Sequence, residues 1–567
     1  MLSHLLIPSP RFVPHLANVA RAPGPARAFL RTLTGRVERA FDLPFGQAGN
    51  PCRHLGALAY WLFWIVAATG IYVYIGFDTR ADGAYASVER LSSNAFPLGS
   101  FARSLHRYAS DAFVVTVLLH LAREWLLGRY AHFRRFSWIT GTLSLWLVFA
   151  SGIGGFWLVW DTLAQYSLIA TTEWLDALPL FGQLTRNFDG GTKVTDRLFS
   201  LLIFLHIGIP LMLLAMMWVH LQRLSRPDTN PPRALACGTL AALSVLSIAM
   251  PVVSASPADL ARAPTRLALD WFYLGVHAFA DVAGPTALWA AAIGFTGWLL
   301  ALSWISREAR TRRPEAAIVD LANCNGCARC FADCPYAAVT MQARTDGKRL
   351  PRQAVVDPDL CAGCGICAGA CPSSTAFRSV TDLVTGIDLP QTPIRTLRAT
   401  LDEELKRITA AAGPAERSLT AAVLTTAPPP RIVLFGCMVD HGGAEITALA
   451  DARTATLTML CAAQLRLSFI EYALRAGADG VLITGCRDGD CAFRLGNRWT
   501  EERLAETREP HLRSVVPRER VGVAWTGCGD PMALAAALES FRALLSAVRS
   551  STVPPPKRTE HAHVASR

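Results

Sequence analysis

The chain has 567 residues, of which 51% are hydrophobic, and it carries a formal net charge of +11 and 15 cysteines. Its mean hydropathy of +0.29 is too high for an ordinary soluble protein and too low for a purely membrane one. The apolar runs precede residue 306, whereas thirteen cysteines follow residue 323, so we predict a membrane half and a soluble half. Arginines gather at the ends of the apolar runs, as topology signals do, and we expect no nucleic-acid partner.

Six apolar runs are long enough to span a bilayer, at about 55–76, 106–127, 138–160, 198–221, 234–254 and 283–305. Arginines crowd the loops on one side. The positive-inside rule then places both termini and the cysteine-rich half in the cytoplasm, against a bacterial inner membrane. Residues 1–52 form a cytoplasmic segment in this scheme, with an amphipathic surface helix at 31–45. A four-helix bundle follows at 53–225, and two more spans occupy 226–306.

Histidines mark two of these spans at one spacing. His106 and His120 are fourteen residues apart, as are His206 and His220, which is close to four helical turns. The predicted topology puts His106 level with His206 and His120 level with His220. Two stacked b-type haems need axial imidazole pairs of this kind inside a helix bundle.

Glycines repeat that spacing on the two neighbouring spans: Gly56 and Gly70 on the first, Gly141 and Gly155 on the third. Because glycine lets a flat ring approach the backbone, one glycine pair at each depth predicts room for a haem edge. Arg103 and Arg123 lie three residues outside His106 and His120. They suit either haem propionates or lipid headgroups.

These features resemble the cytochrome b family of quinol-oxidising complexes over about residues 35–225. The stretch LVWDTLAQYSLIATTEWLDALPLFG after the third span is similar to that family's surface helix at the outer quinol pocket. LDWFYL at 269–274 resembles a degenerate form of the family's Pro-Glu-Trp-Tyr motif, with Asp270 for the glutamate and no proline. The resemblance implies an outer quinone site with Asp270 and Tyr273, and a homodimer through this part. An interfacial aromatic belt explains LDWFYL equally well.

Two copies of C-x₂-C-x₂-C-x₃-C-P follow, at 324–335 and 361–372. In this pattern three thiolates of one copy and the fourth of the other hold each [4Fe–4S] cluster. One cluster is therefore assigned to Cys324, Cys327, Cys330 and Cys371, and the other to Cys361, Cys364, Cys367 and Cys334. Structural zinc, the alternative, usually takes two separated cysteine pairs. The pattern resembles bacterial two-cluster ferredoxins, so we expect a ferredoxin-like α+β domain at 315–380.

Residues 381–429 are expected to form a helical stretch and a linker. Beyond them RIVLFG, ATLTML, GVLITG and VGVAWTG alternate with helical segments, which predicts a small α/β domain with a parallel sheet at 430–548. Cysteines end or follow these strands, where the carboxyl ends of parallel strands converge. A common metal site and scattered buried thiols both remain open. The tail at 549–567 lacks a core and is expected to be disordered.

GADGVLITGCRDGDCAFRLGN at 477–497 resembles the delta subunit of methyl-viologen-reducing hydrogenases, over about residues 430–545. The resemblance implies a [2Fe–2S] cluster held by Cys437, Cys461, Cys486 and Cys491, with Cys528 as a substitute ligand. That family opens with a Cys-x-x-Cys pair. Here Asp440 occupies the second place.

The three parts together predict a multidomain electron-transfer chain with one [2Fe–2S] cluster, two [4Fe–4S] clusters and two b haems. The sequence has no dinucleotide fingerprint or Walker motif, so a partner must collect the electrons. The resemblance implies a cytoplasmic flavoprotein or dehydrogenase of the heterodisulfide-reductase type. We therefore expect an enzyme subunit, a quinone/quinol oxidoreductase with quinone as substrate. The alternative is a membrane redox sensor or docking protein that reports the quinone pool without sustained turnover.

Overall fold

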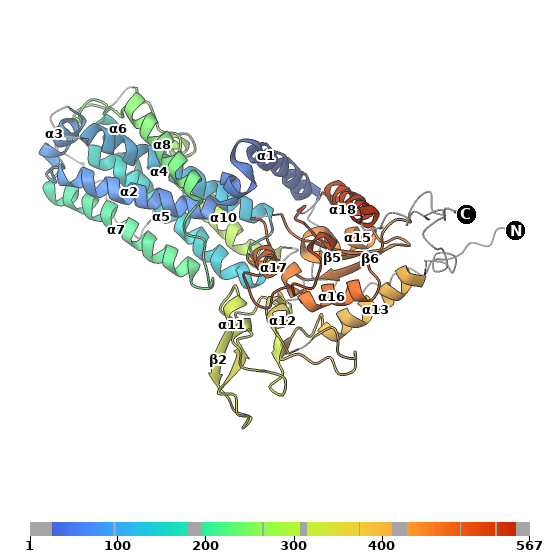
Figure 1. Cartoon of the computed structure of the whole chain (residues 1–567). Coiled ribbons are helices and arrows are strands. Elements are labelled where there is room, and N and C mark those ends of the chain that lie inside the picture. The colour runs from blue at the N-terminus through green and yellow to red at the C-terminus, as the bar shows by residue number, and fades with distance from the viewer. Residues whose placement is uncertain are drawn as a thin grey trace, which may run out of the picture. The chain divides into compact units, whose positions relative to one another are not determined.

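The computed structural model describes residues 25–93, 98–178, 194–263, 266–306, 314–373, 375–410, 428–487, 489–527 and 530–551 (Figure 1). The chain divides into two compact units, one at Pro23–Arg310 and the other formed mainly by Thr311–Arg567. Residues 1–24, most of the linker expected before residue 430, and most of the tail expected at 549–567 lie outside the described residues.

The first unit is helical. Its α-helices are α1 (Pro25–Gly49), α2 (Leu55–Ile75), α3 (Ala81–Ser92), α4 (Gly99–Leu126), α5 (Arg135–Val159), α6 (Thr162–Asp176), α7 (Asp196–Leu221), α8 (Arg233–Ala249), α9 (Gly275–Ala283) and α10 (Pro285–Ile305). Two 3₁₀ turns, η1 (Pro51–Arg53) and η2 (His132–Arg134), precede α2 and α5.

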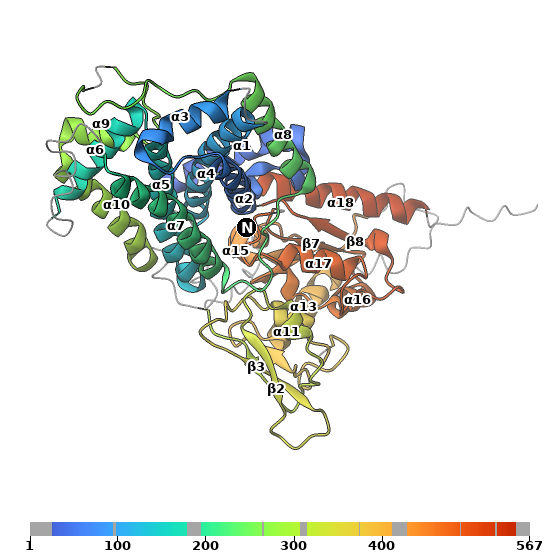
Figure 2. The same ribbon diagram turned by 90° about the vertical axis from the view of Figure 1, so that its left-hand side faces the viewer.

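Four long helices form a bundle in this unit. α2 packs along α4 and α5 packs along α7, and Figures 1 and 2 show all four side by side. Leu62, Phe113, Val148 and Leu213, one from each helix, are buried in a single core. Outward-facing residues such as Ile71 and Phe204 stay exposed. A helix that is apolar both on the face packed into the bundle core and on its outer face is typical of a membrane span.

Five helical segments in the described part of the chain are long and apolar enough to cross a membrane: Leu55–Ile75, His132–Val159, Asp196–Leu221, Pro285–Ile305 and Pro531–Arg549. The first four coincide with predicted spans. The predicted spans in α4 and in the 17-residue α8 fall outside this set. Pro531–Arg549 belongs to the second unit, where its apolar side chains Leu534, Leu538 and Phe541 pack into a protein core.

α1 covers the stretch predicted to be an amphipathic surface helix. Phe29, Leu33, Val37 and Phe41 recur at every fourth position and are all exposed. Residues four apart share one face of a helix, so α1 presents a continuous apolar stripe. Such a stripe suits a helix that lies at a membrane surface.

The second unit begins with an α+β part. β1 (Ile318–Val319) pairs with β4 (Ile387–Asp388), and β2 (Val339–Ala343) pairs with β3 (Arg352–Val356), both antiparallel. The short helices α11 (Arg329–Asp333) and α12 (Ile366–Ala370) each carry the third cysteine of one motif. The two halves therefore repeat one structural unit, as the repeated cysteine pattern predicts.

A parallel four-stranded sheet follows, in the order β6 (Thr454–Met459), β5 (Ile432–Cys437), β7 (Gly480–Thr484), β8 (Val521–Ala524). This confirms the predicted parallel sheet. The helical elements around it are α13 (Ile394–Ala410), α15 (Met438–Thr447), η4 (Ala462–Gln464), α16 (Leu467–Arg475), α17 (Gly496–Leu504), η5 (Arg518–Arg520) and α18 (Pro531–Ser551).

Helices cover both faces of this sheet. Ile432 and Leu434 of β5 pack with α18, whereas Val433 and Phe435 pack with α13 and α16 on the other face. Alternate residues of a strand point to opposite faces, so a strand buried on both sides reads as one apolar run. α13 was expected to precede the sheet domain as a separate stretch, but it supplies part of the core.

We predict that Leu401→Ala weakens the sheet domain. Leu401 is fully buried on α13, and deleting a buried leucine side chain typically costs about 2–5 kcal/mol. Hydrogen–deuterium exchange of the β5 and β6 amides in the purified chain should quicken. Glu403→Ala changes an exposed position on the same helix and should leave exchange unchanged. Equal effects of the two substitutions would contradict this packing.

Candidate functional site

The structure brings together the first predicted histidine pair. The ring centroids of His106 on α4 and His206 on α7 lie 6.4 Å apart, with the ring planes at 76°. Two imidazoles bound to opposite sides of one iron have centroids about 6 Å apart, because each metal–nitrogen bond is about 2 Å long. The spacing of this pair therefore fits one metal between the two rings.

Each of these rings lies against a predicted glycine. A Cβ atom built on Gly70 would lie 2.9 Å from Cε1 of His106, and one on Gly155 would lie 3.0 Å from Cε1 of His206. From the sequence, these glycines are expected to make room for the edge of a haem. In the structure, the space left by each missing side chain is occupied by the imidazole ring of the histidine.

Hydrogen bonds fix the orientation of both rings. Nδ1 of His106 lies 3.0 Å from the carbonyl oxygen of Val66, and Nδ1 of His206 lies 3.1 Å from that of Ser151. A carbonyl oxygen only accepts, so Nδ1 carries the proton and donates it. The lone pair of the neutral ring is then on Nε2. Histidines that bind metals usually donate their other ring N–H in this way.

The second histidine pair repeats the arrangement one level away. His220 lies against Gly141, whose added Cβ would be 3.1 Å from Cε1, and His120 lies against Gly56 at 3.4 Å. Nδ1 of His220 is 3.0 Å from the hydroxyl of Thr140. The donor set of both pairs fits a six-coordinate haem iron with two neutral imidazole ligands.

Both predicted propionate arginines already have protein partners. Arg103 donates a hydrogen bond at 2.7 Å to the hydroxyl of Ser254 and forms an ion pair with Glu89. Nε of Arg123 donates to Glu38 of α1 at 3.1 Å. A haem propionate that contacted these guanidinium groups would therefore share them with their protein partners. Binding of propionates or lipid headgroups by Arg103 and Arg123 stays a prediction.

Asp270 and Tyr273 lie in a buried polar cluster next to His106. Tyr273 is 1% exposed, and its hydroxyl donates to the backbone oxygen of Ser110 at 2.8 Å. Asp270 forms an ion pair with Arg107, which also pairs with Asp111 at 3.4 Å. The cluster joins the LDWFYL segment to α4.

Arg107 and Asp111 were not predicted to take part. Their signal is visible in the sequence, because both are charged residues inside the predicted membrane span at 106–127. Charges at such positions are costly and usually mark function. Their four-residue spacing also places them on one face of α4.

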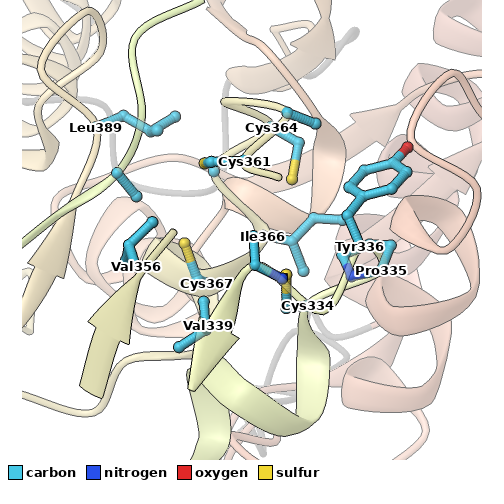
Figure 3. Close-up of a pocket in the computed structure, with 14 residues that line it drawn as sticks. Cys334, Pro335, Tyr336, Val339, Val356, Cys361, Cys364, Ile366, Cys367 and Leu389 are labelled. Carbon is cyan, nitrogen blue, oxygen red and sulfur yellow. The ribbon is translucent and has the colours of Figure 1, made fainter. Parts of the chain in front are cut away.

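The second unit contains two cavities that match the two predicted cysteine sets. Figure 3 shows the first, which is lined by Cys334, Cys361, Cys364 and Cys367. Ile366, Val339, Val356 and Leu389 supply apolar walls. Four thiols around one apolar space fit an iron–sulfur cubane, whose reduction potential depends on such surroundings.

The other cavity is lined by Cys324, Cys327, Cys330 and Cys371. The first three belong to the motif at 324–335, and Cys371 comes from the motif at 361–372. Each cavity is thus closed by a cysteine contributed by the other repeat.

Four more cysteines converge at one end of the parallel sheet. Cys437 ends β5, Cys461 precedes η4, and Cys486 and Cys491 follow β7; all four are buried. Hydrogen bonds to the Cys461 and Cys486 side chains hold the pKa of the Cys491 thiol below its usual value. A thiol with a lowered pKa is a ready metal ligand, because the thiolate is the form that binds.

A glycine completes this site. A Cβ atom on Gly496, the first residue of α17, would collide with Sγ of Cys461 and lie 3.0 Å from Sγ of Cys491. The bare backbone therefore lets the helix approach the thiols. Cys528, the predicted substitute ligand, lies outside the described residues, and the structure does not describe the side chain of Asp440.

Comparison with known families agrees with the three resemblances. Residues 42–227 match the family model for cytochrome b/b6/petB, residues 323–375 match the 4Fe-4S dicluster domain, and residues 438–548 match the methyl-viologen-reducing hydrogenase delta subunit. The apolar helices and the likeness of residues 42–227 to cytochrome b support a multi-pass membrane protein, and residues 323–375 are similar to an iron–sulfur domain. The last match begins one residue after Cys437, so that cysteine rests on the geometry alone.

Relatives of the first unit are named cytochrome b or b6. Cytochrome b6 of Tupiella akineta is 28% identical over 183 residues, which is 31% of this chain and 83% of that protein. Cytochrome b of Rickettsia typhi is 27% identical over 186 residues, 32% of this chain and 46% of that protein. A solved structure titled "Hyperthermophilic respiratory Complex III" covers 50% of this chain and 84% of its own, at 21% identity and a TM-score of 0.39.

We predict that Gly70→Val disturbs one haem and not the other. The added side chain would enter the space of the His106 imidazole and push its Nδ1 from the Val66 carbonyl. The low-spin haem signal of that site should shift or vanish in electron paramagnetic resonance spectra. Gly208→Val, on α7 where nothing lies within 4 Å of an added Cβ, is the control. An unchanged spectrum in Gly70→Val would contradict the assignment of His106 as a haem ligand that packs against Gly70.

Proposed function

We propose that this protein is the membrane electron-transfer subunit of a quinone oxidoreductase. In this role it passes electrons between a partner in the cytoplasm, a flavoprotein or dehydrogenase of the heterodisulfide-reductase type, and the quinone pool. The observation that carries the proposal is the pairing of His106 with His206, each against a glycine and each with Nδ1 on a backbone carbonyl. The two neutral imidazoles of such a site would ligate a haem iron.

The residues proposed to hold the cofactors form three groups. His106, His206, His120 and His220 bind two b haems; the two ferredoxin cysteine sets bind two [4Fe–4S] clusters; Cys437, Cys461, Cys486 and Cys491 bind one [2Fe–2S] cluster. When bound, these groups carry single electrons. The chain's own residues fix their positions and exclude water, since all of these cysteines except Cys327 and Cys361 are buried.

The polar cluster near His106 is the proposed quinone site. Oxidising a quinol releases protons as well as electrons, so the pocket needs a hydrogen-bond acceptor. Asp270 is a carboxylate held by Arg107, and the Tyr273 hydroxyl is a fixed donor and acceptor. Arg107 keeps Asp270 in place, and Asp111 helps to balance the arginine's charge. A general base in such a cluster accepts the proton that the quinol gives up.

We expect His120→Leu and His220→Leu to remove the same haem. Leucine cannot ligate iron, so either change breaks one bis-histidine site and leaves the other intact. Pyridine haemochrome assays on purified protein should show about half of the haem in each variant. The double variant should lose no more than either single one. Loss of different haems in the two single variants would refute the pairing.

We expect Asp270→Asn to slow reduction of the haems by added quinol about 100-fold, the usual contribution of a positioned base. Haem content should stay normal, and stopped-flow absorbance would follow the reduction. Asp82→Asn, an exposed residue on α3, should have no effect. Quinol reduction at the normal rate in Asp270→Asn would rule out this proton acceptor. Sustained turnover of the unaltered protein with a reduced cytoplasmic donor would exclude the redox-sensor alternative.

A further inference from the structure

The ferredoxin part and the sheet part of the second unit meet at several places, and one of these contacts lies beside the predicted cluster cysteines. α12, which carries Cys367, packs against η4, the 3₁₀ turn that directly follows Cys461. A Cβ atom on Gly369 would collide with the backbone oxygen of Ala463, and one on Gly365 would lie 2.9 Å from the Gln464 side chain. Bare backbone at both positions lets the two elements touch.

A buried ion pair holds this contact. Asp333, the neighbour of Cys334, is 2% exposed, and Arg503 of α17 is 1% exposed. Arg503 donates to Asp333 at 2.5 Å and to the backbone oxygen of Ala463 at 2.9 Å. Arg508 donates to the other carboxylate oxygen at 2.7 Å.

Trp499 strengthens the same junction. Its indole N–H donates to the backbone oxygen of Asp333 at 3.1 Å, and the Arg508 guanidinium lies over its ring. One acidic residue is therefore bound by two arginines and one tryptophan of the sheet part. A buried charge requires such partners, so the register of the two parts is fixed at the residue next to a predicted cluster ligand.

The cysteines on the two sides of the contact are close neighbours. Cys367 lies in α12 and Cys364 lies just before it, whereas Cys461 directly precedes η4, so the contact between α12 and η4 brings these cysteines together. α12 also packs against α11, which carries Cys330 of the other ferredoxin cavity. The cavity lined by Cys334, Cys361, Cys364 and Cys367 thus lies between the sheet cysteines and the second ferredoxin cavity.

We infer that the sheet centre exchanges electrons with the Cys334–Cys361–Cys364–Cys367 centre and not directly with the Cys324–Cys327–Cys330–Cys371 centre, and that the Asp333–Arg503 pair positions this junction. The inference rests on the proposed function, since both centres must hold iron. The step moves one electron and no proton. One centre is oxidised by one electron and the other is reduced by one, with the partner flavin and the quinone as terminal donor and acceptor.

Magnetic coupling between the centres tests this order. In the full chain, purified in detergent and fully reduced with dithionite, the [2Fe–2S] signal should relax fast because a paramagnetic cubane lies beside it. Cys364→Ser removes the near cubane, and the fast relaxation should be lost. Cys327→Ser removes the far cubane and should keep it. Iron analysis must show a loss of about four irons in each variant.

A second pair of variants tests the junction without removing a cluster. Arg503→Met should weaken the coupling while iron stays at the normal level, and Arg498→Met, an exposed arginine on the same helix, should not. Coupling lost in Cys327→Ser but kept in Cys364→Ser overturns the order of centres. Full iron content with no coupling in the unaltered protein overturns the inference and leaves the proposed function standing. Absence of iron–sulfur signals defeats both.

Discussion

The helix bundle depends on one kind of hydrogen bond, which a histidine Nδ1–H donates to a backbone carbonyl of the neighbouring helix. That carbonyl already accepts the N–H of the residue four positions later, as every α-helical carbonyl does. At Val66 and Ser151 the residue four positions later is Gly70 or Gly155. The missing side chain opens the carbonyl to a second donor and gives the imidazole ring a place to lie.

This bond explains why the helices pair as they do. His106 reaches from α4 to α2, and His206 reaches from α7 to α5, and these are the two pairs of helices that pack most extensively. A side chain larger than hydrogen at the glycine would push each pair apart. The bond also selects the tautomer, because a ring that donates through Nδ1 keeps its lone pair on Nε2. Helix spacing, ring orientation and metal-binding capacity thus follow from one arrangement.

Features encoded by short spacings could be predicted from the sequence. The fourteen-residue steps place His106 and His120 on one helix face, and the cysteine repeats define loops that close around one space. Exchange of the fourth cysteine between the repeats was expected as well, and each cavity is lined by the four cysteines assigned to it. Short apolar runs that alternate with helical segments predicted a parallel sheet, which the structure confirms.

Contacts between distant residues could not be predicted. Arg107 and Asp270 are 163 residues apart, and Asp333 and Arg503 are 170 apart. No local periodicity relates such positions, so only folding reveals that their charges neutralise each other. Hydropathy alone also fails for α18, which is as apolar as a membrane span by composition. Its apolar face packs on the sheet, through Leu534 and Leu538.

The placement of charges in the bundle distinguishes its two ends under the proposed function. Fourteen residues of helix separate His106 from His120 by about 21 Å, most of the roughly 30 Å hydrocarbon thickness of a bilayer. Next to His106 lie Arg107 and its two ion-pair partners, Asp111 and Asp270, whose carboxylates are groups that can accept protons. Near His120 the carboxylates are held by arginines: Glu38 of α1 pairs with Arg123, and Glu124 pairs with Arg129 and Arg134. Quinol oxidation separates protons from electrons, and haem accepts only electrons. With proton-accepting carboxylates at the His106 end of the bundle, protons and electrons released from a quinol bound there would leave by different routes.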